Sequence, residues 1–266
     1  MKNSNLRKVL HILNGDSMQG QFSQALKDAE YLIWREALCQ GPITYVFHDL
    51  NQINKRKSYL ESLDSSIQIL EGSYLFEQLQ DYHWGYYKSI YLWFEPDLFC
   101  QINQIAAISY FLQQNSSLTI YAIPISEFDA ISKATFSQFE QNDFTEMQNR
   151  FYKLNSSDLE AVDELWKSIT SGITDVNQTS ISLPFISKNL SDWISQTTEL
   201  GIGALLYKKA IIEMCEIPKV KKDLIRTLLT EYSELGFGDL QIEYIISQMI
   251  DQGKISFTPN KKLVTE

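Results

Sequence analysis

Short apolar runs alternate with helix-like stretches along the first half of the chain, and this alternation constrains the fold more than any other feature. The four apolar runs are Val9–Leu13, Tyr31–Trp34, Ser89–Phe94 and Leu118–Ile123. Helical periodicity separates them, as in the apolar stripe from Leu98 to Leu112. Strands that are apolar on both faces and alternate with helices are typical of a parallel sheet covered by helices. We therefore predict an α/β fold with a Rossmann-like domain over residues 1–125.

From about residue 126 the pattern changes to one of successive helices. A capping-box pattern at Ser157-Asp158-Leu159-Glu160 predicts the start of one helix. Further helices are expected at 186–197, 203–215, 219–231 and 239–252, followed by short strands at 255–258 and 262–265. Three helices and a terminal hairpin form the outline of a winged helix. The sequence therefore predicts a helical domain over residues 126–266 that is winged-helix-like from about residue 203.

The charge of the chain disfavours some classes of partner. The 33 Asp and Glu residues outnumber the 23 Lys and Arg residues, and the formal net charge is -10, whereas nucleic acids and anionic membranes bind proteins with surplus cations. The helix expected at 239–252 also carries three carboxylates and no Lys or Arg, unlike a helix that contacts DNA. We expect no nucleic-acid ligand, and we expect these helices to pack against the first domain or a protein partner.

Neither a membrane span nor an export signal is expected. The longest apolar runs have the length of strands and are broken by charge. The run after the basic residues 1–8 is too short for the apolar region of a secretory signal. Cys39, Cys100 and Cys215 are odd in number and widely spaced, which argues against a disulfide framework and a cysteine-based zinc site. The sequence predicts a cytoplasmic protein without membrane contact.

Polar residues gather where three of the expected strands end. The clusters are Gly15-Asp16-Ser17 after the first strand, Arg35-Glu36 after the second and Glu95-Pro96-Asp97 after the third. Parallel strands bring their carboxyl ends to one edge of a sheet, and open α/β sheets bind ligands at that edge. We therefore expect these residues to meet in one site.

Three of these residues are candidates for binding an anion. Arg35 can clamp a phosphate or a carboxylate because its donors form a planar fork. The helix expected after the turn at Gly15 would add free backbone N–H groups and the hydroxyl of Ser17.

Four carboxylates are candidates for the chemistry itself. Asp16 and Glu95 suit a role on a hydroxyl, a water or a divalent ion, and Glu36 is a further catalytic candidate. Asp97 is a candidate ligand-binding residue, although an acidic residue at a helix start also offsets the helix dipole. Asp16, Glu95 and Asp97 could together supply oxygen ligands to magnesium or manganese. Their spacing is unspecific, so the cofactor stays unknown.

Structural explanations compete with these roles. Asp16 or Ser17 can simply cap the following helix, with Gln19 completing a capping box from Asp16. Arg35 and Glu36 can form an internal ion pair. The chain contains no HExxH, GxSxG or GxxxxGK[ST] motif that would decide between the alternatives.

Three motifs of the chain have counterparts in a known family. They are the strand running into Gly15-Asp16-Ser17, Trp34-Arg35-Glu36 followed by Gly41-Pro42, and Trp93-Phe94-Glu95-Pro96-Asp97-Leu98-Phe99-Cys100-Gln101. Together they resemble the bacterial family named for domain of unknown function 1835 (DUF1835), and Leu183-Pro184-Phe185 and Gly238-Asp239 resemble its helical C-terminal part. The resemblance implies the same architecture and no settled activity. It implies that the following positions matter: Gly15, Asp16, Ser17, Arg35, Glu36, Glu95, Asp97 and the candidate ligand-binding residue Gln101.

Different classes of function stay open on this basis. In the first, the protein binds a phosphorylated or carboxylated small molecule, for instance a nucleotide, and acts as a hydrolase or transferase. In the second, it is a non-enzymatic interaction or regulatory protein whose helical domain binds a protein partner. Transcriptional regulation would need a basic face that only the following residues could build: Lys219, Lys221, Lys222, Arg226, Lys261 and Lys262.

Overall fold

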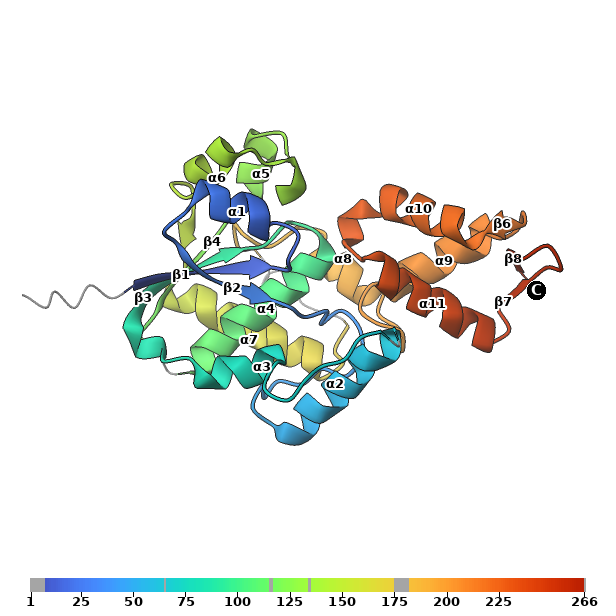
Figure 1. Cartoon of the computed structure of the whole chain (residues 1–266), viewed down its shortest axis with the longest axis horizontal. Coiled ribbons are helices and arrows are strands. Elements are labelled where there is room, and N and C mark those ends of the chain that lie inside the picture. The colour runs from blue at the N-terminus through green and yellow to red at the C-terminus, as the bar shows by residue number, and fades with distance from the viewer. Residues whose placement is uncertain (1–7, 65, 115–116, 134, 175–181, 266) are drawn as a thin grey trace, which may run out of the picture.

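The main sheet of the protein has five strands in the order β2-β1-β3-β4-β5 (Figure 1). The computed structural model describes residues 8–64, 66–114, 117–133, 135–174 and 182–265. The strands are β1 (Lys8–Asn14), β2 (Glu30–Trp34), β3 (Tyr87–Trp93), β4 (Thr119–Ala122) and β5 (Tyr152–Lys153). The first four are parallel, and β5 is antiparallel to β4. The fold is therefore α/β with a mostly parallel sheet, as the alternating apolar runs predict.

Helices cover both faces of this sheet, which explains why its strands are apolar on both sides. On one face lie α1 (Gln19–Ala25), α5 (Ile125–Ala130) and α6 (Gln141–Met147). On the other lie α2 (Leu50–Leu63), α3 (Leu75–Gln78), α4 (Leu98–Gln113) and α7 (Ser156–Thr170). Single 3₁₀ turns occur at Leu79–Asp81, Trp84–Tyr86 and Phe136–Gln138. Successive residues of β1 point to opposite faces of the sheet. Ile12 packs in the core on the side of α4, and Leu13 packs in the core on the side of α1 and α6.

The rest of the chain forms a helical unit with a small antiparallel sheet of order β6-β8-β7. Its elements are α8 (Leu190–Ser195), α9 (Ala204–Met214), β6 (Lys219–Val220), α10 (Lys221–Glu231), the 3₁₀ turn Ser233–Leu235, α11 (Asp239–Asp251), β7 (Ile255–Phe257) and β8 (Lys262–Thr265). β6 lies where the start of a helix was expected, because Lys219 and Val220 pair with β8 before α10 begins. Among the described helices, none has both the length and the apolar composition needed to cross a bilayer.

The sheet does not end near residue 125, where the sequence analysis places a domain boundary. β5 pairs with β4, and α7 packs along α4. Phe128 and Phe144 belong to the same core cluster as Leu13 and Trp93. The α/β unit therefore extends to Thr170. A two-residue strand such as β5 leaves no periodic signal in the sequence.

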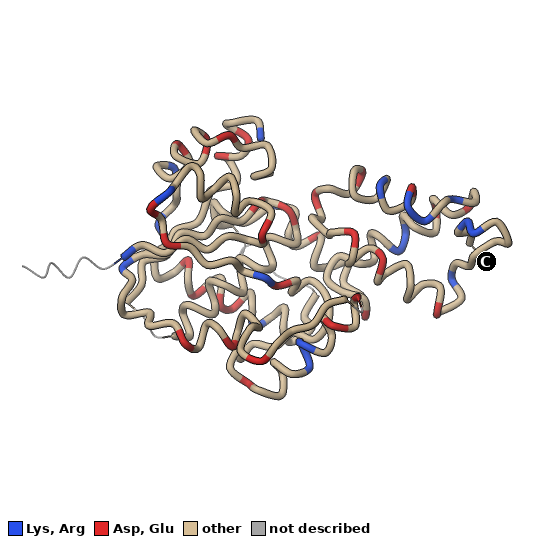
Figure 2. Tube along the Cα trace, viewed as in Figure 1, with Lys and Arg blue, Asp and Glu red and all other residues tan. Residues whose placement is uncertain are grey.

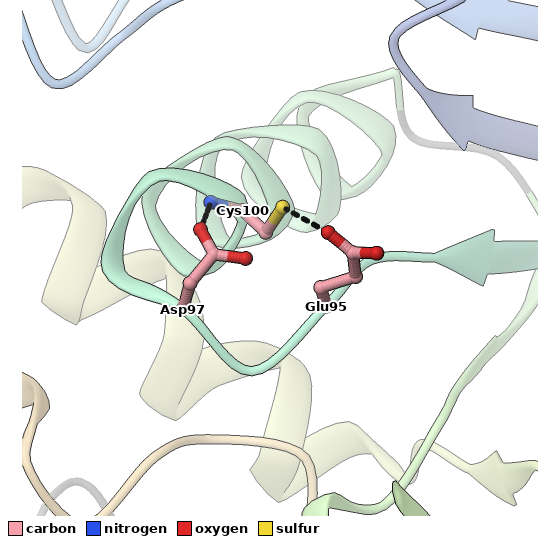
Figure 3. A group of neighbouring side chains, drawn as sticks. All are labelled: Glu95, Asp97 and Cys100. Atoms are coloured by element: carbon pink, nitrogen blue, oxygen red, sulfur yellow. Dashed lines mark hydrogen bonds between the residues drawn. The ribbon is translucent and has the colours of Figure 1, made fainter. Parts of the chain in front are cut away.

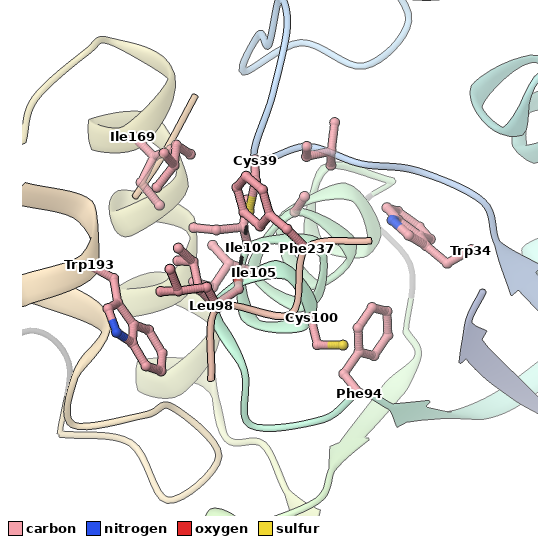
Figure 4. Packing of buried hydrophobic residues seen from close by; sticks show 14 of the residues in the cluster. Trp34, Cys39, Phe94, Leu98, Cys100, Ile102, Ile105, Ile169, Trp193 and Phe237 are labelled. Atoms are coloured by element: carbon pink, nitrogen blue, oxygen red, sulfur yellow. Dashed lines mark hydrogen bonds between the residues drawn. The ribbon is translucent and has the colours of Figure 1, made fainter. Parts of the chain in front are cut away.

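The helical unit packs on the α/β unit at the first turn of α4, and one hydrophobic core runs through both. Figure 4 shows this junction, with side chains from the two units interleaved around Leu98. The backbone N–H of Ile202 donates to the carbonyl of Cys39 at 2.7 Å. Tyr244 of α11 makes an edge contact with Tyr59 of α2, with ring centres 5.6 Å apart. The helical unit therefore lies against the carboxyl edge of the sheet, where the candidate residues are.

The start of α7 differs in detail from the predicted capping box. Asn155 is the N-cap, and its side chain accepts hydrogen bonds from the backbone N–H groups of Ser157 and Asp158 at 2.9 and 3.1 Å. Asp158 completes the box by accepting from the N–H of Asn155 at 2.9 Å. The box thus begins two residues before the predicted Ser157, because Asn155 offers the same acceptor chemistry earlier in the chain.

Candidate functional site

The strand register brings the three polar clusters to the same level at one edge of the sheet. Asn14 at the end of β1 pairs with Trp34 at the end of β2, and Leu13 pairs with Trp93 at the end of β3. The strand order also reverses direction between β1 and β3, since β2 is added on one side of β1 and β4 on the far side of β3. Open α/β sheets commonly bind ligands beside such a reversal.

Glu95, Asp97 and Cys100 form a compact group at this edge (Figure 3). One possible ligand atom from each lies within 4.8 Å of the others. Glu95 follows β3, Asp97 is the N-cap of α4, and Cys100 lies in the first turn of that helix. The Cys100 thiol donates to Glu95 Oε2 at 3.8 Å, and the Cys100 N–H donates to Asp97 Oδ1 at 2.8 Å. The turn around Pro96 thus folds two carboxyl groups onto one helix end.

Glu95 holds its proton more tightly than an ordinary carboxyl group. Burial and the negative charge of Asp97 raise the pKa of Glu95 to about 7, although hydrogen bonds from the Phe136 N–H and the Cys100 thiol oppose this rise. A carboxyl group whose pKa lies near neutral pH can both donate and accept a proton under those conditions. Glu95 therefore has the property that acid–base catalysis requires.

Asp97 is a helix cap that the helical unit covers. Burial raises the pKa of Asp97, while the N–H of Cys100 favours its charged form. Gly236 lies against it with φ 67°, and a Cβ atom at Gly236 would stand 1.9 Å from Asp97 Oδ1. The helix-start role of Asp97 is thus observed directly, and residue 236 can only be a glycine without a shift of the backbone or the carboxylate.

A chain of side-chain hydrogen bonds connects this group to the ends of β1 and β2. Asn14 Nδ2 donates to Cys100 Sγ at 2.9 Å, and Asn103 Nδ2 donates to Asn14 Oδ1 at 3.2 Å. Asn103 Nδ2 also lies 2.9 Å from the carbonyl of Glu36. Asn14, Cys100 and Asn103 are not among the site residues predicted from the sequence. The available signal was a set of polar side chains, Asn103 among them, in a helix that is mostly apolar.

Asp16 and Arg35 form a two-pronged ion pair on the exposed rim of the edge. Arg35 Nε donates to Asp16 Oδ2 at 2.9 Å, and Nη2 donates to Oδ1 at 2.7 Å. More than half of each side chain is exposed. The hydrogen bonds to Asp16 raise the pKa of Arg35, so the guanidinium stays charged. Within the described residues, Nη1 of Arg35 makes no hydrogen bond, and the end of the guanidinium remains available.

Glu36 has a separate and enclosed set of partners. Arg56 donates to Glu36 Oε2 from Nη2 at 2.7 Å and from Nε at 2.9 Å, and the Tyr74 hydroxyl donates to Oε1 at 2.6 Å. The side chain of Arg56 is 4% exposed and that of Glu36 is 0% exposed. The ion pair between Arg35 and Glu36, which was one alternative from the sequence, is not formed, because Arg35 pairs with Asp16 and Glu36 with Arg56. This geometry favours a structural role for Glu36, which holds α2 and Tyr74 to the end of β2.

The helix after Gly15 begins at Gln19, two residues later than the start expected at Ser17. α1 begins at Gln19, and its N-cap, Met18, makes no side-chain cap. Gly15 has φ 83°, and the Asp16 carbonyl accepts from the Gln19 N–H at 3.1 Å, so a turn precedes the helix. Neither Asp16 nor Ser17 caps α1. A helix of only seven residues also contributes a weak dipole, and Ser17 lies exposed beside the turn.

Gln101 is buried and its amide is occupied. Nε2 lies 3.2 Å from the carbonyl of Phe185, and Oε1 accepts from the Ser187 N–H at 2.9 Å. The side chain is 1% exposed. Gln101 thus joins α4 to the segment that leads into α8, and this geometry favours positioning of the chain over direct contact with a ligand.

The residues that could hold a metal differ from the expected set. Asp16, one of the three expected ligands, is paired with Arg35 instead. The third possible ligand beside Glu95 and Asp97 is the thiol of Cys100. Magnesium and manganese prefer oxygen ligands, whereas a thiolate suits zinc or another softer ion. Burial raises the pKa of Cys100 well above its usual value, which opposes thiolate formation. These donors do not form a typical magnesium site, and we assign no metal.

No protein-family model matches this chain, and no curated protein shows significant similarity to it. Membership of the DUF1835 family therefore stays a prediction from the strand-end motifs. The function has to be argued from the geometry of the carboxyl edge.

Proposed function

We propose that the protein binds a small phosphorylated or carboxylated molecule, such as a nucleotide, at the carboxyl edge of the sheet between β1 and β3. In this proposal Arg35 holds the anion, and Glu95 gives or takes a proton in a hydrolysis or group transfer in the cytoplasm. The order β2-β1-β3-β4, with helices in the connections, supports a Rossmann-like interpretation of the sheet. In such sheets this edge is the usual place of the ligand.

The geometry of Arg35 supports the anion-binding part of the proposal. Asp16 occupies the side of the guanidinium formed by Nε and Nη2 and so fixes its plane. The end formed by Nη1 and Nη2 is a second two-donor edge that a phosphate or carboxylate can accept from. Because the charge of Asp16 offsets part of the attraction, a dianionic phosphate is favoured over a single carboxylate.

The raised pKa of Glu95 is the observation that carries the catalytic part. A value of about 7 allows proton exchange at neutral pH. A short series of contacts also connects Glu95 to the end of β1, next to Asp16 and Arg35. Its carboxylate accepts from the Cys100 thiol, which accepts from Asn14, and Asn14 lies two residues before Asp16.

The helical unit serves this site as a cover in our proposal. The order α9, β6, α10, α11, β7, β8 supports a winged-helix-like interpretation. The helix that would enter a DNA groove, α11, instead packs on α2 through Tyr244, and the carbonyl of Gln241 accepts from Gln40 Nε2 at 3.3 Å. Figure 2 shows that basic residues gather on α10 and the neighbouring strands, away from this contact. Gly236 brings the same unit onto Asp97.

A non-enzymatic interaction protein is the second candidate function. A groove of about 570 Å³ lies between α10 and α11, and it is lined by Lys222, Arg226 and the exposed Leu229. Ile217, just before β6, is 76% exposed. Exposed apolar side chains beside basic ones are typical of a surface that binds a protein. This candidate is favoured if no anion binds at the carboxyl edge.

A thermal-shift screen tests the leading proposal. Nucleotides, sugar phosphates, dicarboxylates and divalent ions are added to the full chain, and a ligand at about 100 times its Kd should stabilise the fold by about 2.7 kcal/mol. Arg35→Ala should abolish that stabilisation without unfolding the protein. Arg226→Ala is the matched control, because Arg226 is also an exposed arginine beside an aspartate. Equal stabilisation of the Arg35→Ala variant and the parent would remove Arg35 from the site.

A further inference from the structure

An open groove of about 530 Å³ lies on the face of the sheet that α1 and α6 cover. The groove begins where those short helices end, because its walls include Leu26 to Ala29, just after α1, and Gln148 and Asn149, just after α6. Its floor is formed by Val9 and other residues of β1 and β3. The volume falls within the range of small-molecule sites. The groove uses the amino half of β1, whereas the carboxyl-edge site begins at the other end of that strand.

A row of aromatic side chains crosses the sheet at the floor of this groove. The strand register places Tyr31, His11, Tyr91 and Tyr121 side by side on β2, β1, β3 and β4. The rings of His11 and Tyr91 stack with centres 5.3 Å apart, and those of Tyr91 and Tyr121 are nearly parallel at 4.5 Å. His11 and Tyr91 both line the groove.

His11 supplies the floor with a hydrogen-bond donor that has no partner among the described residues. It is 3% exposed, and its Nδ1 accepts from Trp93 Nε1 at 2.9 Å. An Nδ1 that accepts places the ring proton on Nε2. Within the described residues, Nε2 makes no hydrogen bond. Burial lowers the pKa of His11 to about 4, so the ring is neutral at pH 7.

The walls and rim of the groove combine apolar and polar surface without a net charge. Leu26 and Ala29 offer apolar contact, and Lys27 and Asp28 are adjacent residues of opposite charge. The side-chain amides at the rim, Gln148 and Asn149, make no hydrogen bond within the part of the chain that the structure describes. Each amide offers two donors and an acceptor. A neutral ligand with several hydroxyl groups and a partly apolar ring matches this surface better than an anion does.

We propose that this groove is a second binding site, for an uncharged polyhydroxylated ring such as a free sugar or the sugar of a nucleoside. His11 Nε2 donates to a ligand oxygen, the rim amides bind further hydroxyl groups, and the apolar wall packs against the C–H face of the ring. A charged phosphate finds no compensating cation on the floor, because His11 stays neutral. The proposal does not depend on the function proposed for the carboxyl edge.

The indole N–H signal of Trp93 reports binding directly, since Trp93 donates to the ring of His11. In ¹H–¹⁵N spectra of the labelled full chain, this signal is one of five indole signals, and Trp93→Phe assigns it. The probes are D-ribose, D-glucose and adenosine, each added up to ~20 mM, a range that covers weak sites. At least one probe should shift the Trp93 signal with saturation. A response to adenosine alone identifies the nucleoside as the source of the sugar.

Variants at Gln148 and Asn149 decide whether the shift comes from the groove. Asn149→Ala combined with Gln148→Ala should weaken binding at least ~10-fold, which is about 1.4 kcal/mol. Asn142→Ala is the matched control, because it removes an exposed amide from α6 outside the groove, and it should leave binding unchanged. Arg35→Ala should not affect the response. The proposal is overturned if no probe gives a saturable shift, or if the shift persists in the rim variant.

Discussion

Replacing Glu95 by Gln is expected to stabilise the protein above pH 7 and to change its stability little near pH 4. In the folded chain, burial and Asp97 raise the pKa of Glu95 to about 7 from an ordinary value of 4.5. The unfolded chain therefore releases this proton at a lower pH than the folded chain does. The free energy of unfolding consequently falls as the pH rises from about 4.5 to about 7. At about 1.4 kcal/mol per pKa unit, the full loss is about 3 kcal/mol.

The Glu95→Gln variant would avoid this loss because an amide stays neutral at every pH. The amide oxygen can still accept from the Phe136 N–H, and the amide nitrogen can lie beside the Cys100 sulfur as a donor. The gain therefore comes from removing a buried charge rather than from a new contact. A stabilising change at this position is typical of a residue kept for activity, since functional groups are often held in unfavourable surroundings.

His11 affects the pH profile in the opposite direction. Burial lowers its pKa to about 4 from 6.5, so the unfolded chain binds the proton first as the pH falls. Stability thus rises with pH between about 4 and 6.5 and partly cancels the effect of Glu95. The parent profile alone cannot separate the two groups. The difference between the parent and Glu95→Gln can, because His11 is the same in both.

Urea unfolding at several pH values between about 4 and 8, followed by circular dichroism, measures this difference. The free energies of the two proteins should agree near pH 4 and diverge to about 3 kcal/mol near pH 8. Glu146→Gln is the control, because the Glu146 side chain is 65% exposed, and its difference from the parent should stay small at every pH. Parallel profiles for Glu95→Gln and the parent would refute the conclusion that burial keeps Glu95 protonated.

Two further substitutions test packing around the site, each measured by urea unfolding at neutral pH. Gly236→Ala should cost about 3 kcal/mol, because the new Cβ atom would meet Asp97. Gly72→Ala is the control and should cost about 1 kcal/mol, because Gly72 has a similar φ of 72° but open space around it. Equal costs for the two variants would argue against a close approach of Gly236 to Asp97. Arg56→Met leaves Glu36 buried without its partner and should cost about 3–5 kcal/mol. A cost of a few tenths would mean that water reaches this pair.

The strands of the main sheet could be predicted because burial on both faces leaves an apolar run in the sequence. The predicted run Val9–Leu13 and the observed β1 differ by one residue at each end. The two-residue strands β5 and β6 could not be predicted, since they form only where β4 and β8 supply hydrogen-bond partners. The length of a strand, rather than its composition, therefore decides whether it can be predicted from the sequence.

Helix caps were predictable where a single acceptor stands directly before the helix. Asp97, after Pro96, is such a case, and it caps α4. Asp16 also precedes a helix, but the positive φ of Gly15 turns the chain first, and α1 starts three residues after Asp16. A sequence pattern shows which residues can cap, whereas the turn geometry decides which of them reaches the free N–H groups.

The convergence of the strand ends followed from topology, but the partners of each side chain did not. An ion pair between Arg35 and Glu36 was one alternative from the sequence. Successive side chains after β2 instead separate, so that Arg35 pairs with Asp16 at the exposed rim and Glu36 pairs with Arg56 in the interior. The partners of Glu95 include the Phe136 N–H, 41 residues away. Contacts of this kind depend on how loops cross the sheet edge, and no local spacing encodes them.

The raised pKa of Glu95 depends on the second half of the chain. The pKa of Glu95 is raised by burial, and Phe136 packs on Trp93 and donates its N–H to Glu95. Gly236 covers Asp97 from the helical unit. A fragment that ended at residue 125 would lack both covers, so water would reach the two carboxyl groups and the pKa of Glu95 would return toward 4.5. The boundary expected from the sequence therefore cuts through the candidate site, and the strand ends alone would not raise the pKa of Glu95.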